Sequence, residues 1–125
     1  MCAGAGGYAE YAVTDWGRTV PIPANMSFEV AATLPVAVAT MHDALITNGK
    51  LKKGETVLIQ GASSGVGLMA LQIAKLMGAG LVIGTSTNAG RLAKLKDFGA
   101  DLAVDTSKPN WHEEVKKASP GGKGV

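Results

Sequence analysis

Apolar and polar positions change their spacing near the middle of the chain. From residue 51 onward, short apolar runs alternate with longer segments whose apolar residues recur at helical spacing. Strands are predicted at residues 57–59, 81–83 and 102–104, where the apolar runs are nearly uninterrupted, as in strands buried on both faces. Helices are predicted at residues 68–77 and 88–98, because Gly follows each segment directly as a stop signal.

This alternation is a βαβαβ unit. Crossovers between parallel strands are almost always right-handed, so the predicted fold class is α/β, with the first βαβαβ half of a Rossmann doubly wound parallel sheet. A further short helix is expected at residues 111–117, with Val115 facing the core. A fourth strand of such a sheet would begin where the chain ends, at Val125. We therefore expect these residues to be the middle portion of a longer protein.

The first fifty residues predict a less regular arrangement. Aromatic and β-branched side chains at residues 8–13 follow turn-forming glycines and predict a short strand. Ser27 is expected to cap a helix, and Pro35 is expected to break it. A second helical run is expected from about residue 36 to 47, ending at Asn48 and Gly49, two residue types that tolerate a left-handed cap.

Charge and cysteine content exclude several classes of function. The net charge of +2 comes from 12 basic and 10 acidic residues scattered along the chain, without the basic stripe that a nucleic-acid partner requires. Cys2 is the only cysteine, which excludes a disulfide framework or a Cys-rich zinc lobe and fits a reducing cytoplasm. The apolar stretches at residues 31–41 and 65–77 are interrupted or too short to span a bilayer, so we expect a soluble cytoplasmic protein without a membrane partner.

The loop at residues 61–67, Gly-Ala-Ser-Ser-Gly-Val-Gly, lies between a predicted buried strand and a predicted helix. In this context small residues allow a diphosphate to approach main-chain N–H groups at a helix N-terminus. Four residues are expected to bind the phosphates through unpaired main-chain N–H groups: Ser64, Gly65, Val66 and Gly67. The loop matches the G-x-G-x-x-G pattern only in part, so a tight turn without a ligand is the alternative.

The end of the second predicted strand indicates which nucleotide would bind. A dinucleotide site that prefers NADH places an Asp or Glu there, but no carboxylate occurs between Glu55 and Asp97. Arg91 follows shortly afterwards, and its guanidinium can pair with a 2′-phosphate. The sequence therefore predicts NADPH as cofactor, the alternative being that Arg91 is an ordinary solvated helix residue.

Several sequence blocks in the same order resemble the quinone oxidoreductase (zeta-crystallin) branch of the medium-chain dehydrogenase/reductase superfamily. They include Gly-Tyr-Ala-Glu-Tyr-Ala-Val at residues 7–13, the blocks at residues 23–35 and 54–59, the glycine loop, and Phe-Gly-Ala-Asp at residues 98–101. The resemblance implies that residues 1–25 are a remnant of a GroES-like catalytic domain and linker, and that residues 26–125 are the N-terminal half of a Rossmann NADPH-binding domain.

The same resemblance implies positions around the cofactor. Thr40 would lie near the nicotinamide, and Thr106 beside the adenine. Thr85 and Ser86 would join Arg91 around the 2′-phosphate. His42 stands where relatives usually carry Tyr, so Thr40 and His42 are the candidate catalytic residues in a site otherwise unassigned.

The implied reaction is hydride transfer from NADPH to a quinone or an α,β-unsaturated carbonyl, by a zinc-free homodimeric parent enzyme. The Cys and His clusters that hold zinc in the related alcohol dehydrogenases do not occur in this sequence. The chain by itself is expected to be inactive. Two alternatives stay open: a short-chain dehydrogenase, which shares the G-x-x-x-G-x-G loop, and a nucleotide-binding module without turnover.

Overall fold

A single parallel sheet forms the centre of the structure, a computed structural model that describes residues 6–125. Its strands are β1 (Thr56–Ile59), β2 (Leu81–Ser86) and β3 (Leu102–Asp105), in the order β1-β2-β3. Both strand pairs are parallel, with Val57 opposite Val82 and Thr85 opposite Val104. The predicted α/β fold and the βαβαβ unit are therefore confirmed. Cys2 lies outside the described residues.

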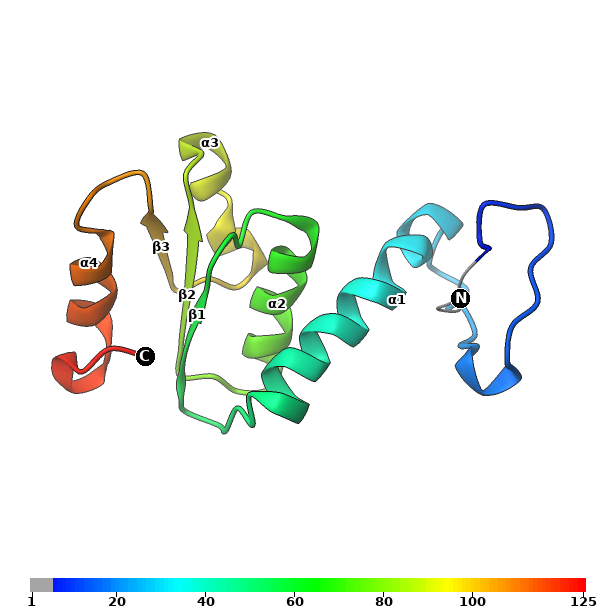
Figure 1. The fold of residues 1–125 in the computed structure, drawn as a ribbon, viewed down its shortest axis with the longest axis horizontal. Coiled ribbons are helices and arrows are strands. Elements are labelled where there is room, and N and C mark those ends of the chain that lie inside the picture. The colour runs from blue at the N-terminus through cyan, green and yellow to red at the C-terminus, as the bar shows by residue number, and fades with distance from the viewer. Residues whose placement is uncertain (1–5) are drawn as a thin grey trace.

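Helices cover both faces of this sheet. They are α1 (Phe28–His42), α2 (Gly65–Leu76), α3 (Ala89–Leu92) and α4 (Trp111–Ala118), with α2 on one side of the sheet and α4 on the other (Figure 1). A 3₁₀-helix, Leu95–Phe98, follows α3 and ends at Gly99 in the left-handed conformation (φ 105°). Two layers of helix around a parallel sheet are the arrangement expected of a doubly wound fold.

The hydrophobic core is split by the sheet into two clusters. Val57, Ile59 and Val82 face α2, where they pack with Leu71 and Leu95. On the opposite face, Ile83 and Val104 pack with Val115 of α4, as the sequence predicted for that residue. The split follows from the period-two alternation of side chains along a strand.

The region before the sheet differs from the sequence predictions. The strand predicted at residues 8–13 is wrong: these residues form no strand, and Tyr8, Tyr11 and Val13 are fully or almost fully exposed. A strand needs a hydrogen-bonded neighbour, and composition alone does not supply one.

Pro35 does not break the helix that Ser27 caps. α1 runs through it to His42 and continues as a π-helical segment, Asp43–Asn48. The ring of proline fixes φ near the helical value, so the helix continues although Pro35 has no N–H to donate and its ring crowds the carbonyl four residues earlier. The helix ends at Asn48 with Gly49 as its C-cap, as predicted, but Gly49 is right-handed (φ −71°) and the left-handed residue is Lys50 (φ 52°).

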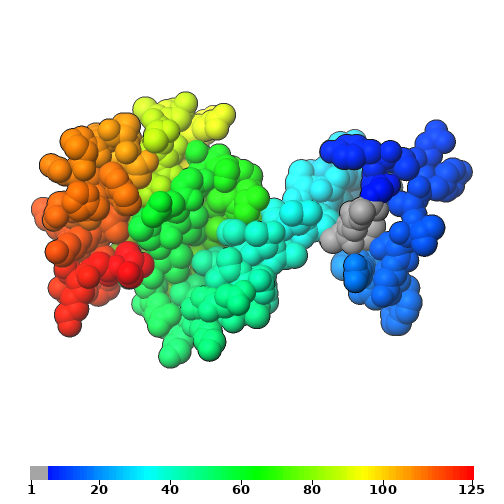
Figure 2. All heavy atoms as spheres, viewed as in Figure 1, coloured from blue at the N-terminus to red at the C-terminus, as the bar shows by residue number. Residues whose placement is uncertain are grey.

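Because the helix is continuous, the longest apolar helical segment is longer than the sequence predicted. Residues Phe28–Asn48 form one 21-residue helix with a mean hydropathy of 1.4, the single helix in the described part that is long and apolar enough for a membrane span. The sequence prediction treated it as two shorter runs. Length and composition of this kind also occur in core helices of soluble proteins, so they do not assign the helix to a membrane. In Figure 2 the N-terminal part of this helix projects away from the sheet domain.

Candidate functional site

The loop after β1 is held against the end of β2 by its own backbone. Gly61 adopts a left-handed conformation (φ 64°), and its N–H donates to the Thr85 hydroxyl at 3.2 Å. The next N–H, from Ala62, donates to the Thr85 carbonyl at 2.9 Å. Thr85 is only 2% exposed, so its hydroxyl supports the loop, a role that the sequence did not indicate. Its expected contact with a 2′-phosphate stays a prediction.

The first turn of α2 carries the main-chain N–H groups expected to bind phosphate. Two of the four are engaged: the Ser64 N–H donates to the Gly61 carbonyl at 3.0 Å, and the Gly67 N–H donates to the Ser64 hydroxyl at 3.1 Å. The N–H groups of Gly65 and Val66 form no hydrogen bond within residues 6–125. The expectation of four unpaired groups is wrong for Ser64 and Gly67, because a serine N-cap satisfies one donor of its own helix.

The two glycines of this turn have different roles. A Cβ on Gly67 would lie 2.6 Å from the Gly61 carbonyl oxygen and 2.7 Å from Ala62 Cα, so this glycine is required for the loop to pack on the helix. A Cβ on Gly65 would meet nothing within 4 Å. The space in front of the two unpaired N–H groups is therefore open on the side of Gly65.

A second link joins this loop to β2 through side chains. The hydroxyl oxygens of Ser63 and Ser86 lie 3.0 Å apart, and Ser86 Oγ also accepts from the Asn88 N–H at 3.2 Å. The Ser86 carbonyl accepts from the Thr106 N–H at 3.2 Å, which places the start of the loop after β3 beside them. The structure thus gathers Ser63, Ser86 and Thr106 at the carboxyl edge of the sheet, where ligands bind in open α/β folds.

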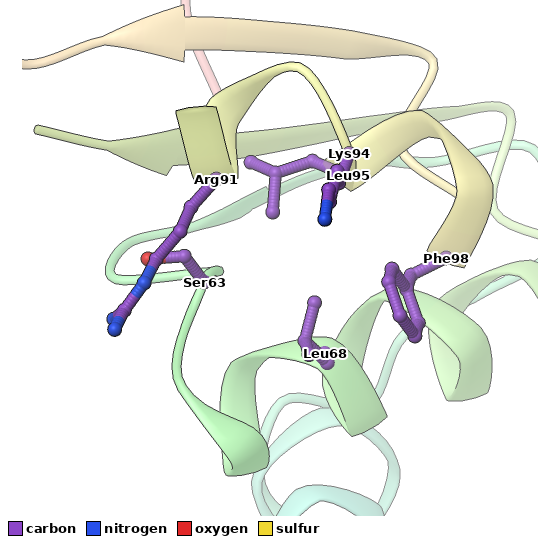
Figure 3. A pocket seen from close by; sticks show the side chains of 6 residues that line it. All are labelled: Ser63, Leu68, Arg91, Lys94, Leu95 and Phe98. Carbon is purple, nitrogen blue, oxygen red and sulfur yellow. The ribbon is translucent and has the colours of Figure 1, made fainter. Parts of the chain in front are cut away.

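Arg91 reaches a cavity next to this edge. The cavity has a volume of about 250 Å³, and six side chains line it: Ser63, Leu68, Arg91, Lys94, Leu95 and Phe98. Figure 3 shows the side chain of Arg91 running past Ser63, while the amino group of Lys94 points into the space between Ser63 and Phe98. Ser63 and Lys94 were not among the predicted site residues. The sequence signal for Lys94 was its place three positions after Arg91, which is about one turn further along the helix predicted at residues 88–98.

Thr40 and His42 lie apart from this group. Both are exposed residues of α1, the helix that packs against α2. Within residues 6–125 no hydrogen bond or ion pair joins either side chain to the glycine loop. Their expected places near the nicotinamide stay predictions. Among the described residues no three His, Cys, Asp or Glu side chains are grouped as a metal site.

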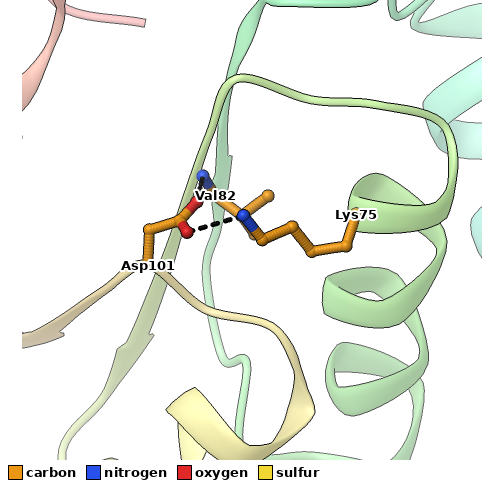
Figure 4. Close-up of polar contacts among 3 residues, drawn as sticks. All are labelled: Lys75, Val82 and Asp101. Carbon is orange, nitrogen blue, oxygen red and sulfur yellow. Dashed lines mark hydrogen bonds and ion pairs between the residues drawn. The ribbon is translucent and has the colours of Figure 1, made fainter.

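At the opposite edge of the sheet, a carboxylate fixes the far end of α2. Asp101 accepts from Lys75 Nζ at 2.6 Å and from the buried Val82 N–H at 2.7 Å (Figure 4). Burial alone would raise the pKa of Asp101, but the hydrogen bond from Lys75, the hydrogen bond from Val82 and the Lys75 charge together lower it. The helix that presents the unpaired N–H groups is therefore tied at both ends.

Comparison with known proteins identifies the family. The model of a family described as zinc-binding dehydrogenase matches residues 65–125. The chain is 35% identical over 121 residues to the human quinone oxidoreductase, covering 97% of this chain and 36% of the relative. It is 38% identical over 109 residues to 2-methylene-furan-3-one reductase from Solanum lycopersicum, covering 86% of this chain and 28% of the relative.

Solved structures agree with these relatives. An NAD-dependent alcohol dehydrogenase has a TM-score of 0.89 at 40% identity, covering 96% of this chain and 34% of that one. The Escherichia coli quinone oxidoreductase complexed with NADPH has a TM-score of 0.70 at 31% identity, covering 80% of this chain and 30% of that one. The chain thus spans about a third of the length of the human quinone oxidoreductase and of the alcohol dehydrogenase structure.

The matches extend over the residues before the glycine loop as well as after it, which the short-chain alternative does not explain. Together they support the medium-chain dehydrogenase/reductase superfamily, in its quinone oxidoreductase-like part, as the family of this chain.

Proposed function

We propose that the whole protein carrying this chain is an NADPH-dependent oxidoreductase that transfers hydride to a quinone or an α,β-unsaturated carbonyl. The observation that carries the proposal is the first turn of α2. There the N–H groups of Gly65 and Val66 are unpaired, lie at the start of a 12-residue helix, and follow β1 after a short loop. Such a helix N-terminus favours a diphosphate through its free donors and its dipole.

The preference for NADPH rests on charge at the end of β2. An acidic residue there would bind the ribose hydroxyls of NADH, but β2 ends in Thr85 and Ser86. Arg91 lines the neighbouring cavity and supplies a planar cation suited to a phosphate. Among similar structures, one is named as NAD-dependent and another is complexed with NADPH, so similarity alone does not choose the cofactor, and the choice made here rests on Arg91 and the missing carboxylate.

NADPH, when bound, supplies the hydride, and the residues of this chain bind and orient it. Gly65 and Val66 would donate to the diphosphate, and Arg91 would pair with the 2′-phosphate. The links from the glycine loop to Thr85 and Ser86 hold the donors at a fixed distance from the end of β2. This rigidity limits the conformational cost of binding. Thr40 is proposed near the nicotinamide, Thr106 beside the adenine, and His42 as a second candidate near the reacting end.

Oxidation of NADPH by the whole protein with a panel of quinones and enones tests this proposal. We expect activity with NADPH well above that with NADH, and Arg91→Ala to reduce the difference. Tight NADPH binding with no oxidation would instead favour a nucleotide-binding module. Equal activity with both cofactors would remove the role given to Arg91.

The remaining properties follow the same proposal. The protein is proposed to be a zinc-free cytoplasmic homodimer, with most of the substrate pocket supplied from outside these residues. The isolated 125-residue chain should bind NADPH weakly and reduce no quinone. Quinone reduction by the chain alone would contradict this assignment.

A further inference from the structure

We propose that Lys94 is a second cation for the 2′-phosphate and, together with Arg91, determines the preference for NADPH; this inference rests on the proposed function. Both side chains line the same cavity beside Ser63. Arg91 lies in α3 and Lys94 lies between α3 and the 3₁₀-helix Leu95–Phe98, so both reach the cavity from the same short stretch of chain. Figure 3 shows Arg91 running past Ser63 and the amino group of Lys94 on the other side of Ser63, towards Phe98.

Neither positive charge is neutralised by the protein. The two ion pairs within residues 6–125 are Lys75 with Asp101 and His112 with Glu113, and neither involves the cavity. No acidic residue lines the cavity. An anion bound in the cavity would supply the opposite charge that both side chains lack there.

The charge of the anion follows from this arrangement. A phosphate monoester carries about −1.5 to −2 charges near neutral pH, which matches two cations. Leu68, Leu95 and Phe98 form the rest of the lining, and apolar walls strengthen an ionic contact by lowering the effective dielectric constant. A 2′-phosphate fits these requirements, whereas a ribose hydroxyl gains nothing from a second cation.

The two cations are chemically complementary. The guanidinium of Arg91 presents a fork that fixes the orientation of a phosphate, while the amino group of Lys94 is a mobile point charge. Lys94 therefore adds attraction without a strict geometric demand. Its replacement by Arg should preserve most of its effect.

The test is binding of adenosine 2′,5′-bisphosphate and of 5′-AMP to the whole protein, measured by calorimetry. The first probe carries the 2′-phosphate and the second lacks it, and neither can be reduced. We expect Lys94→Gln to weaken the bisphosphate roughly tenfold, which corresponds to about 1.4 kcal/mol, and to leave 5′-AMP unchanged. Lys94→Arg should bind both probes as the wild type does.

Lys96→Gln is the matched control, because Lys96 is an exposed lysine of the same segment that does not line the cavity. Equal effects of Lys94→Gln and Lys96→Gln would overturn the inference. In that case, if Arg91→Ala bound the bisphosphate no more tightly than 5′-AMP, the proposed function would stand with Arg91 alone and without Lys94. If the wild type bound neither probe, both proposals would fail. Melting temperatures of all variants, expected to be equal, exclude misfolding as the cause.

Discussion

The hydroxyl oxygens of Ser63 and Ser86 lie 3.0 Å apart across 23 residues of sequence, and this contact joins the glycine loop to the end of β2. The Ser86 hydroxyl also accepts from the Asn88 N–H, so Ser86 takes part in both hydrogen bonds. Ser86 is 5% exposed, which shields the contact from water.

Removing either hydroxyl should loosen the loop. We expect Ser63→Ala to lower the free energy of unfolding by about 0.5–1.5 kcal/mol, and Ser86→Ala by about 1–2 kcal/mol because the Asn88 N–H also loses its acceptor. Urea denaturation of both single variants and the double variant measures the coupling between them. Strictly additive effects would show that the two hydroxyls do not interact.

The two glycines at the start of α2 provide a paired test of loop and ligand. Gly67→Ala should destabilise the fold by about 1–3 kcal/mol, because the added methyl group would overlap the backbone of Gly61 and Ala62. Gly65→Ala meets open space and should fold normally, yet weaken nucleotide binding by placing a methyl group beside the unpaired N–H groups.

Thermal unfolding and NADPH titration of the same two variants separate these effects. A stable Gly67→Ala variant would contradict the close packing of loop and helix. Unchanged NADPH affinity in Gly65→Ala would show that the diphosphate does not bind beside the N–H groups of Gly65 and Val66.

The carboxylate of Asp101 should make stability depend on pH in the acid range. Its pKa is lowered below the ordinary value of 3.8, so it contributes stability that is present above that value and is lost as the pH falls through the folded-state pKa. Asp101→Asn should therefore be less stable than the wild type near neutral pH and approach it in strong acid. Asp101→Ala should lose about 1–3 kcal/mol near neutral pH, because the buried Val82 N–H loses its acceptor.

Urea denaturation at a series of pH values measures these differences. Glu114→Gln, at an exposed position of α4, serves as the control and should change stability little at any pH. A constant gap between Asp101→Asn and the wild type down to strong acid would contradict the role of the charge.

Pro35 interrupts the hydrogen bonds of α1 without ending the helix. Pro35→Ala should restore the N–H bond to the carbonyl of Ala31 and raise the local stability of α1 by up to about 3 kcal/mol. Hydrogen exchange of amides in this helix measures the change, with the exposed Val36→Ala variant as a comparison. Unchanged exchange rates in Pro35→Ala would show that the proline costs the helix nothing.

The sequence by itself determined the β–α alternation, because short apolar runs and helical periodicity are local properties of the sequence. Each directs its own segment to a strand or a helix once a core is present to cover the apolar side. It also located the glycine loop, the helix stop at Gly99 and the inward position of Val115. Each of these depends on residues within a few positions of one another. The strand predicted at residues 8–13 failed because strand formation depends on a neighbour, which local composition does not encode.

Tertiary structure decided how the pieces of the site come together. Only the fold brings Ser63 to Ser86, buries the hydroxyl of Thr85 under the loop, and places Lys94 in the same cavity as Arg91. It also decided that two of the four expected N–H groups are already satisfied by the loop and the Ser64 cap. The physical reason is that hydrogen bonds and charge clusters depend on distances between segments, and those distances are set by how strands pair and helices pack.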